Sequence, residues 1–401
     1  MIEVHSKALD KSIETCRIIG EVKGILPGPT LIFMGGIHGN EPAGVFALHS
    51  AMQALKVIPS IKGHVYALAG NLSALKEGIR FCVEDLNRVW TSQRMNSLPQ
   101  DPAMAENSDI REQIEVFRII RSILESDKGP FYFFDIHTTS SETLPFLTVN
   151  DSLLNRSFSS LFPLPIILGI EEYLEGPILS YINELGYVAF GFEAGQHDQM
   201  GAIENALAFI NLSLVFAGSL SKSQIDFQRY YDHIAKTTGG KPRMFEITHR
   251  HLIASDEDFK MLPGFFNFQK IKKDQCIAKS NGNIIKAKYD GRIFMPLYQP
   301  QGSDGFFTIQ KIPAPFLRLS AFIRRHRLDR ILVLLPGVKW ADKVKSGLIV
   351  NRKIARFMAK DLFHLFGYRH SYLDHDRLKM ENRESMAKYS MYKGTPWFKS
   401  G

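Results

Sequence analysis

His38 and Glu41 lie three residues apart in a glycine-rich turn, Gly-Gly-Ile-His-Gly-Asn-Glu-Pro, at residues 35–42. The turn directly follows the apolar run 30–34, which has the composition of a buried strand. Zn²⁺ binds both imidazole nitrogens and carboxylate oxygens. The active sites of open α/β sheets lie beyond the carboxyl ends of the strands. We therefore interpret His38 and Glu41 as two zinc ligands that need a third ligand from elsewhere in the chain.

A second apolar stretch, Phe-Phe-Asp-Ile-His-Thr-Thr at residues 133–139, ends in a histidine that supplies the third ligand. A catalytic zinc ion has three protein ligands and one open position, whereas a structural ion has four protein ligands. His38, Glu41 and His137 make three. Asp135 lies two residues before His137, so both side chains project from the same face of the strand. Asp135 is therefore a candidate for orienting a ligand.

Two arginines and an amide fall within the short stretch Arg-Phe-Cys-Val-Glu-Asp-Leu-Asn-Arg at residues 80–88. The planar guanidinium group of arginine matches a carboxylate with two parallel hydrogen bonds. Arg80, Asn87 and Arg88 therefore suggest a substrate that carries a carboxylate, and a donor for a developing oxyanion. The alternative is a surface ion pair of these arginines with Glu84 or Asp85.

Glu193 ends another apolar strand, in the sequence Phe-Gly-Phe-Glu-Ala-Gly at residues 190–195. A partly desolvated glutamate is basic enough to accept a proton from metal-bound water. Because zinc lowers the pKa of that water towards about 7, both groups operate near neutral pH. The four segments together point to a zinc-dependent hydrolase.

Up to about residue 215, short apolar strands alternate with helical patterns, which is typical of a mostly parallel sheet covered by helices on both faces. The strands are expected at 31–35, 64–69, 131–136, 146–149, 166–168 and 188–192. The helices are expected at 43–55, 110–125, 152–161, 177–185, 204–220 and 225–236. The expected fold class is α/β, with a mixed, mostly parallel sheet flanked by helices.

The chain divides into three predicted parts: a catalytic domain over 1–240, a small all-β domain over 241–315 and a basic α/β extension over 316–401. The sequence Thr-Thr-Gly-Gly-Lys-Pro at 237–242 marks the first boundary. From Lys311 onward there are 20 Lys and Arg against 7 Asp and Glu, whereas the rest of the chain has 29 against 34. Within the extension, a strand is expected at 330–335 and an amphipathic helix around 354–366.

The motifs His-Gly-Asn-Glu at 38–41, Asp-Leu-Asn-Arg at 85–88, Asp-Ile-His-Thr at 135–138 and Glu-Ala-Gly at 193–195 resemble the succinylglutamate desuccinylase/aspartoacylase family, a branch of the carboxypeptidase A-like zinc hydrolases. The similarity covers roughly residues 30–312, including turns of the second domain that resemble the family's C-terminal β-domain. The sequence departs from the family at Asn71-Leu72, where Asn-Pro is frequent, and from Phe316 onward, where the better-known members have no counterpart.

The resemblance implies a role for each matching residue. His38, Glu41 and His137 would bind one Zn²⁺ ion. Glu193 would activate water as the general base and then protonate the leaving amine, while Arg80 would polarise the scissile carbonyl and stabilise its oxyanion. Asn87 and Arg88 would hold the substrate carboxylate. The implied reaction is hydrolysis of a small N-acyl amino acid to a carboxylate and a free amino acid.

Composition excludes several other classes of protein. The chain is 45% hydrophobic and 22% charged, as in globular proteins, and its three cysteines are too few for a disulfide framework. The N-terminus lacks a signal-peptide pattern, and the apolar stretch 206–220 is too short to span a bilayer. We therefore expect a cytoplasmic protein that binds neither membranes nor nucleic acid. We also expect the basic extension to dock on the catalytic domain or on a neighbouring subunit of a homo-oligomer.

Two alternatives remain open from the sequence. The first is a metallocarboxypeptidase-type peptidase that acts on peptides or cell-wall fragments, which an open cleft would favour. The second is a non-catalytic binding protein whose basic extension is the functional part. The presence of all three ligands and of Glu193 argues against the second alternative, because a degenerate relative is expected to lose at least one of them.

Overall fold

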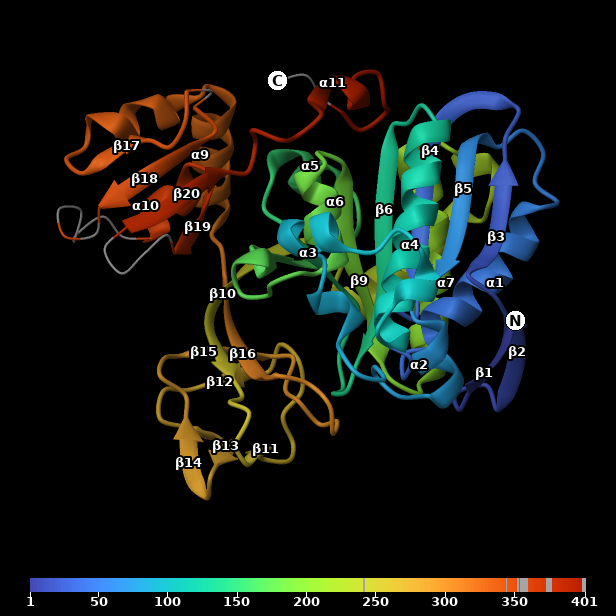
Figure 1. The fold of residues 1–401 in the computed structure, drawn as a ribbon, viewed down its shortest axis with the longest axis horizontal. Coiled ribbons are helices and arrows are strands. Elements are labelled where there is room, and N and C mark those ends of the chain that lie inside the picture. The colour runs from blue at the N-terminus through green and yellow to red at the C-terminus, as the bar shows by residue number, and fades with distance from the viewer. Residues whose placement is uncertain (241, 344, 352, 354–359, 373–376, 399–401) are drawn as a thin grey trace.

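The computed structural model describes residues 1–401 except 241, 344, 352, 354–359, 373–376 and 399–401. Its centre is a mixed eleven-stranded sheet (Figure 1). In spatial order its strands are β12 (Lys270–Ile271), β15 (Gly291–Phe294), β16 (Asp304–Lys311), β10 (Arg243–Leu252), β8 (Pro165–Leu168), β7 (Phe146–Val149), β9 (Val188–Gln196), β6 (Phe131–Thr139), β4 (Leu26–Gly35), β5 (Lys62–Ala69) and β3 (Ile18–Lys23). From β10 to β5 the neighbours are parallel except for β7 and β9. The predicted α/β fold class is therefore confirmed.

Helices cover both faces of this sheet, and each face has its own apolar core. One core contains residues of α1 (Ala43–Leu55), α5 (Leu153–Ser159), α7 (Met200–Ala217) and α8 (Phe227–Thr238); the other contains residues of α4 (Ser108–Ser126) and α6 (Ile178–Glu184). Strand β6 serves both cores, because Tyr132 and Phe134 pack into the first and Phe131 and Phe133 into the second. This alternation follows from the two-residue period of a strand.

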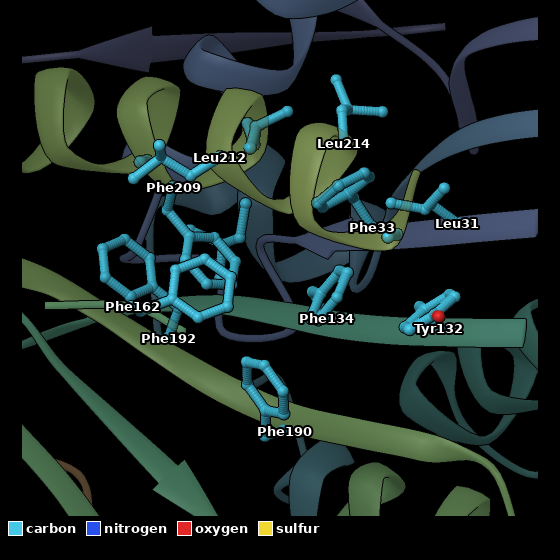
Figure 2. Close-up of a cluster of buried hydrophobic side chains, with 14 of the residues drawn as sticks. Leu31, Phe33, Tyr132, Phe134, Phe162, Phe190, Phe192, Phe209, Leu212 and Leu214 are labelled. Atoms are coloured by element: carbon cyan, nitrogen blue, oxygen red, sulfur yellow. The ribbon is translucent and has the colours of Figure 1, made fainter. Parts of the chain in front are cut away.

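Aromatic rings fill the first core (Figure 2). Phe192 of β9 stacks on Phe209 of α7 with ring centroids 4.2 Å apart, and Phe134 of β6 meets the same ring edge-on. By length and composition α7 could cross a membrane, but 61% of its apolar span is buried inside the molecule. Its contacts with α1 and β9 explain the apolar composition as core packing.

Local patterns located most elements of the first 240 residues. Helix α1 and strand β7 have the predicted bounds, and the other predicted strands and helices of this part differ only at their ends. Three N-terminal strands escaped prediction: β1 (Ile2–Ser6), β2 (Lys11–Thr15) and β3. They alternate polar and apolar residues over only five or six positions; β1 and β2 form a two-stranded sheet, and β3 lies at one edge of the central sheet. A short edge strand gives a weak sequence signal.

The predicted β-domain is joined to the central sheet. β10 pairs in parallel with β8, and β16 and β15 continue the same sheet beyond it. Only β11 (Phe259–Met261), β13 (Cys276–Ser280) and β14 (Asn283–Lys286) form a separate three-stranded sheet in the described part of this region. The sheet of the catalytic domain thus continues into β10, β16 and β15, which follow residue 241 in the chain. A domain boundary at residue 241 therefore remains a prediction.

The extension forms a small α/β unit with its own apolar core. Its elements are α9 (Ala314–Arg325), η5 (Leu328–Leu334), β17 (Val338–Trp340), β18 (Gly347–Asn351), α10 (Lys360–Leu365), β19 (Tyr368–Tyr372), β20 (Arg377–Asn382) and α11 (Tyr389–Tyr392). The strand predicted at 330–335 is wrong, because these residues lie mostly in the 3-10 helix η5. There Leu332 turns into the core while Ile331 and Leu334 are exposed, which matches a helical period. Part of the helix predicted at 354–366 lies outside the described residues.

Buried ion pairs hold the extension against the catalytic domain, in agreement with the predicted docking. Arg324 of α9 has a fully buried side chain that donates to Asp151 Oδ2 at 2.8 Å. Arg383 lies 3.3 Å from the same oxygen and 3.0 Å from Glu171 Oε1. A further, partly exposed pair joins Arg369 to Glu184 at 2.9 Å. The positive charge of the extension thus meets carboxylates of the catalytic domain.

Asp151→Asn should weaken this junction. Burial favours the neutral acid, but Arg156, Arg324 and Arg383 outweigh it and hold the pKa of Asp151 well below its usual range. A carboxylate with a lowered folded-state pKa contributes stability above its unfolded pKa of about 4, and the contribution is lost as the pH falls further. Because the variant leaves buried Arg324 and Arg383 without this partner, we expect it to lose about 3 kcal/mol of unfolding free energy at pH 7.

Urea denaturation at pH 7 and pH 3 measures this effect. The difference between Asp151→Asn and the unchanged chain should be large at pH 7 and shrink at pH 3. The control is Asp290→Asn, which removes a carboxylate that is 64% exposed and paired with Lys272 on the surface. Equal midpoints for Asp151→Asn and this control at pH 7 would contradict the expected role of the buried pairs.

The last described residues return to the catalytic domain and enter its first core. Figure 1 shows this segment, drawn in red, passing back from the extension to the end of the sheet where β6 begins. The Tyr392 hydroxyl donates to the carbonyl oxygen of Phe131 at 2.5 Å and accepts from the amide of Val188 at 2.8 Å. The indole of Trp397 donates to the Tyr132 hydroxyl at 2.9 Å. Residues from the end of the extension therefore complete a core that the first domain does not close alone.

Candidate active site

The predicted site residues gather at one edge of the sheet because neighbouring parallel strands end there. The turn that carries His38 and Glu41 follows β4, while His137 and Glu193 lie near the ends of β6 and β9 and are register partners. The turn is tightly packed: a Cβ atom on Gly39 would lie 2.0 Å from the backbone of Ala74. Glycine at this position lets the turn pack against helix α2 (Leu72–Glu77).

Glu41 lies between the two histidines. Its Oε1 is 2.9 Å from His38 Nδ1, and its Oε2 is 3.2 Å from His137 Nδ1. The backbone amide of Thr138 also donates to Oε2 at 2.8 Å. All three side chains are buried, and their potential ligand atoms lie within 4.8 Å of one another. Burial favours neutral Glu41, but the histidines outweigh it and hold its pKa well below the usual range. The arrangement fits a divalent cation bound by two nitrogens and a carboxylate.

Two further carboxylates contact the outer nitrogens of the histidines. Asp85 Oδ1 lies 3.1 Å from His38 Nε2, and Asp135 Oδ2 lies 2.7 Å from His137 Nε2. These contacts orient each ring so that Nδ1 faces Glu41. Carboxylates that bind the second nitrogen of a histidine commonly orient metal ligands in this way. The sequence suggested this position for Asp135, whereas Asp85 was expected only to pair with an arginine.

Glu193 faces the same cluster with one oxygen unused. Within the described residues, its buried Oε2 has no hydrogen-bond partner. Burial, opposed by the charge of His137, raises the pKa of Glu193 to about 8. A divalent cation beside it would favour the carboxylate and lower that pKa again. An unpartnered carboxylate oxygen at this place is suited to accept a proton from a water molecule.

Arg80 lies between Asp85 and the ligand cluster. Its Nε and Nη2 donate to Asp85 Oδ2 at 3.2 and 3.1 Å, and its Nη1 lies 3.6 Å from Glu41 Oε1. Its backbone amide donates to the side chain of Gln301 at 3.2 Å. The expected ion pair with Asp85 is thus present, and it holds the guanidinium group beside the cluster.

Asn87 and Arg88 line the same cavity from the 3-10 turn η1 (Leu86–Arg88). The side-chain oxygen of Asn87 accepts a hydrogen bond from the amide of Ile178 at 3.1 Å, and its NH₂ group lies 3.4 Å from His137 Nε2 and has a second hydrogen that can be donated into the cavity. Arg88 donates through Nη1 to the Asn87 carbonyl at 2.8 Å, and its Nη2 lies 3.4 Å from Asp304 Oδ2. Its buried Nε has no partner among the described residues.

The β-region closes one side of the cavity, whose volume is about 120 Å³. Residues between β15 and β16 form this wall. Gln299 accepts hydrogen bonds from Asn40 at 2.9 Å and from His197 at 3.2 Å, and Asp304 contacts Arg88. The sequence assigned no role to Gln299 or Asp304, because their partners Asn40 and Arg88 lie 259 and 216 residues away along the chain.

The fold and the clustered side chains define an α/β protein with a candidate metal site at one edge of its central sheet. Residues 27–209 match the sequence model described as the succinylglutamate desuccinylase/aspartoacylase catalytic domain. The matched segment spans 183 of the 401 residues, so the likeness to the family is shown for this domain, and members of the family are deacylating hydrolases. The resemblance inferred from the four motifs is therefore confirmed.

Solved structures share the fold at low sequence identity. A succinylglutamate desuccinylase/aspartoacylase from Rhodobacter sphaeroides is 17% identical with a TM-score of 0.54, covering 73% of this chain and 88% of its own. A succinylglutamate desuccinylase from Vibrio cholerae is 14% identical with a TM-score of 0.54, covering 76% and 94%. A product-bound ectoine utilization protein from Ruegeria pomeroyi is 16% identical with a TM-score of 0.50, covering 73% and 88%.

Proposed function

We propose that this protein is a zinc-dependent amidohydrolase that cleaves the amide bond of small N-acyl amino acids. The observation that carries the proposal is the buried cluster of His38, Glu41 and His137, faced by a Glu193 oxygen that has no hydrogen-bond partner among the described residues. Zn²⁺ commonly binds two imidazole nitrogens and one carboxylate. Asp85 and Asp135, which contact the second nitrogen of each histidine, are placed as carboxylates that orient metal-binding histidines. When bound, zinc supplies a Lewis acid that polarises a carbonyl and lowers the pKa of water.

The protein side chains then have complementary tasks. Glu193 accepts a proton from the water that adds to the acyl carbonyl, and returns a proton to the nitrogen as the C–N bond breaks. Arg80 donates to the oxygen that becomes negative in the transition state. Asn87 and Arg88 hold the carboxylate of the amino acid. The products are a carboxylate and a free amino acid.

The wall formed between β15 and β16 favours small substrates over peptides. Gln299 and Gln301 connect this wall to the turn that carries Asn40 and to Arg80, so that it covers the side of the cluster. A peptidase needs room for a long substrate beside its metal, whereas this wall closes one side of the cavity. We also propose a cytoplasmic location. A homo-oligomer remains a prediction that the mass in solution tests.

The expected results are one zinc ion per chain and hydrolysis of N-acyl amino acids by the zinc-loaded protein. His137→Ala removes one of three ligands, so it should lose stoichiometric zinc and activity together. Metal analysis after dialysis and an assay of free amine measure both quantities. The exposed His5 provides a control, since His5→Ala should retain both.

Cleavage of peptides alone, with N-acetyl and N-succinyl amino acids untouched, would replace this proposal by the peptidase alternative. Full zinc retention by His137→Ala would contradict the ligand assignment. Zinc content therefore tests the assignment of the metal ligands, and the hydrolysis assay tests the substrate class.

A further inference from the structure

The described residues that line the cavity include two guanidinium groups, Arg80 and Arg88, and each already faces a carboxylate. Arg80 is bound by Asp85 and lies beside Glu41. Arg88 lies beside Asp304 and keeps one buried donor, Nε, without a partner in this part of the chain. Of the two guanidinium groups, Arg88 is therefore the one that can bind a carboxylate of the substrate, and it can bind one.

Asp304 is held in place from outside the cavity. Its Oδ1 accepts from Arg250 Nε at 2.5 Å, and the same guanidinium group donates to the carbonyl oxygen of Tyr173. The side chain of Asp304 is 13% exposed, so solvent screens its charge poorly, and the positive charges of Arg88 and Arg250 offset part of it. A second substrate carboxylate near Arg88 would lie beside this fixed negative charge. Like charges that face each other in a buried site are strongly unfavourable.

The cavity wall next to Arg88 is apolar. Ile170, Leu174 and Leu179 line it from one segment, and Phe307 lines it from β16. This segment is fixed beside Arg88 by two hydrogen bonds: the Ile178 amide donates to the side-chain oxygen of Asn87 at 3.1 Å, and the Trp90 amide donates to the Gly176 carbonyl at 2.9 Å. A group attached close to the bound carboxylate therefore meets aliphatic and aromatic side chains. Among the described lining residues of this wall, none offers a positive charge.

We propose, building on the proposed function, that the substrates are N-acyl derivatives of amino acids with an uncharged, apolar side chain. Arg88 binds their single carboxylate, the side chain packs on the wall of Ile170, Leu174 and Phe307, and Asp304 rejects a second carboxylate. Asp304 is thus a specificity-determining residue. Substrates with additional carboxylates, such as N-acetylaspartate and N-succinylglutamate, are disfavoured.

The test compares kcat/KM of the zinc-loaded full chain on N-acetylleucine, N-acetylaspartate and N-succinylglutamate. We expect N-acetylleucine to exceed both others by on the order of 100-fold, because opposed buried like charges cost several kcal/mol. Asp304→Asn removes the repelling charge and leaves Arg250 without this partner. The ratio of kcat/KM on N-acetylleucine to kcat/KM on each of the other two substrates should therefore fall by about tenfold. Asp290→Asn, a surface carboxylate of the same region, should leave the ratio unchanged.

The outcomes separate this inference from the proposed function. Equal or faster hydrolysis of N-acetylaspartate or N-succinylglutamate by the unchanged chain would overturn the inference and leave the amidohydrolase assignment intact. A zinc-loaded chain that cleaves none of the three compounds would overturn the proposed function itself, and the inference with it. If Asp304→Asn folds and the ratio stays unchanged, the role assigned to Asp304 is wrong.

Discussion

Glu193→Gln is expected to lower kcat by about 10²–10⁴-fold while the chain keeps its zinc, because the change removes a general base and leaves the metal ligands in place. Glutamine has nearly the same volume as glutamate but cannot accept the proton of water. In the structure Glu193 lies at the end of β9 opposite His137, with a buried oxygen that has no partner among the described residues. Glutamine can occupy that space without displacing His137.

The measurement is single-turnover kinetics on an N-acyl amino acid, with zinc content determined on the same sample. Glu204→Gln is the matched control, because it makes the same chemical change on the exposed side of α7. It should retain normal turnover. Zinc-loaded Glu193→Gln that hydrolyses substrate within a few-fold of the unchanged chain would exclude Glu193 as the general base.

Replacing both Tyr392 and Trp397 with alanine is expected to destabilise the catalytic domain, although both residues belong to the far end of the chain. Both side chains are at least nine-tenths buried in the first core, against Tyr132 and Phe158. Removing one buried aromatic side chain costs about 3–5 kcal/mol, and a typical domain has a stability of only 5–15 kcal/mol. The double variant should therefore unfold at least about 10 °C below the unchanged chain.

Thermal unfolding followed by circular dichroism measures this effect. Tyr392→Phe is an informative intermediate, because it keeps the ring and removes the hydroxyl that bonds to Phe131 and Val188. It should cost about 1–3 kcal/mol, the penalty for a buried group left without its hydrogen bond. Met386→Ala, at a side chain that is 57% exposed, serves as the control. An unchanged melting temperature in the double variant would show that the C-terminal segment is not part of this core.

A chain that ends at residue 315 should show the same defect more strongly. It would lose both aromatic residues and leave Asp151 without the two arginines of the extension. The expected result is insoluble or aggregated protein. Normal solubility, mass and activity of this shortened chain would show that the extension contributes nothing to the domain that it contacts.

The sequence by itself determined the candidate metal cluster and the strands that present it. The runs before His38, His137 and Glu193 are apolar and end in polar residues, and parallel strands bring their carboxyl ends to one edge. These signals are local in each segment, so they could be recognised without the tertiary structure. The bounds of α1 and β7 followed from the same kind of periodicity.

Only the tertiary structure decided how the charges of the site are balanced and what closes the first core. Asp304 reaches Arg88 across 216 residues of chain, and Tyr392 reaches Phe131 across 261. No periodicity within either segment encodes such a pairing. The joining of β10 to the central sheet and the docking of the basic extension have the same origin, because contacts between distant segments depend on packing of the whole chain rather than on local propensity.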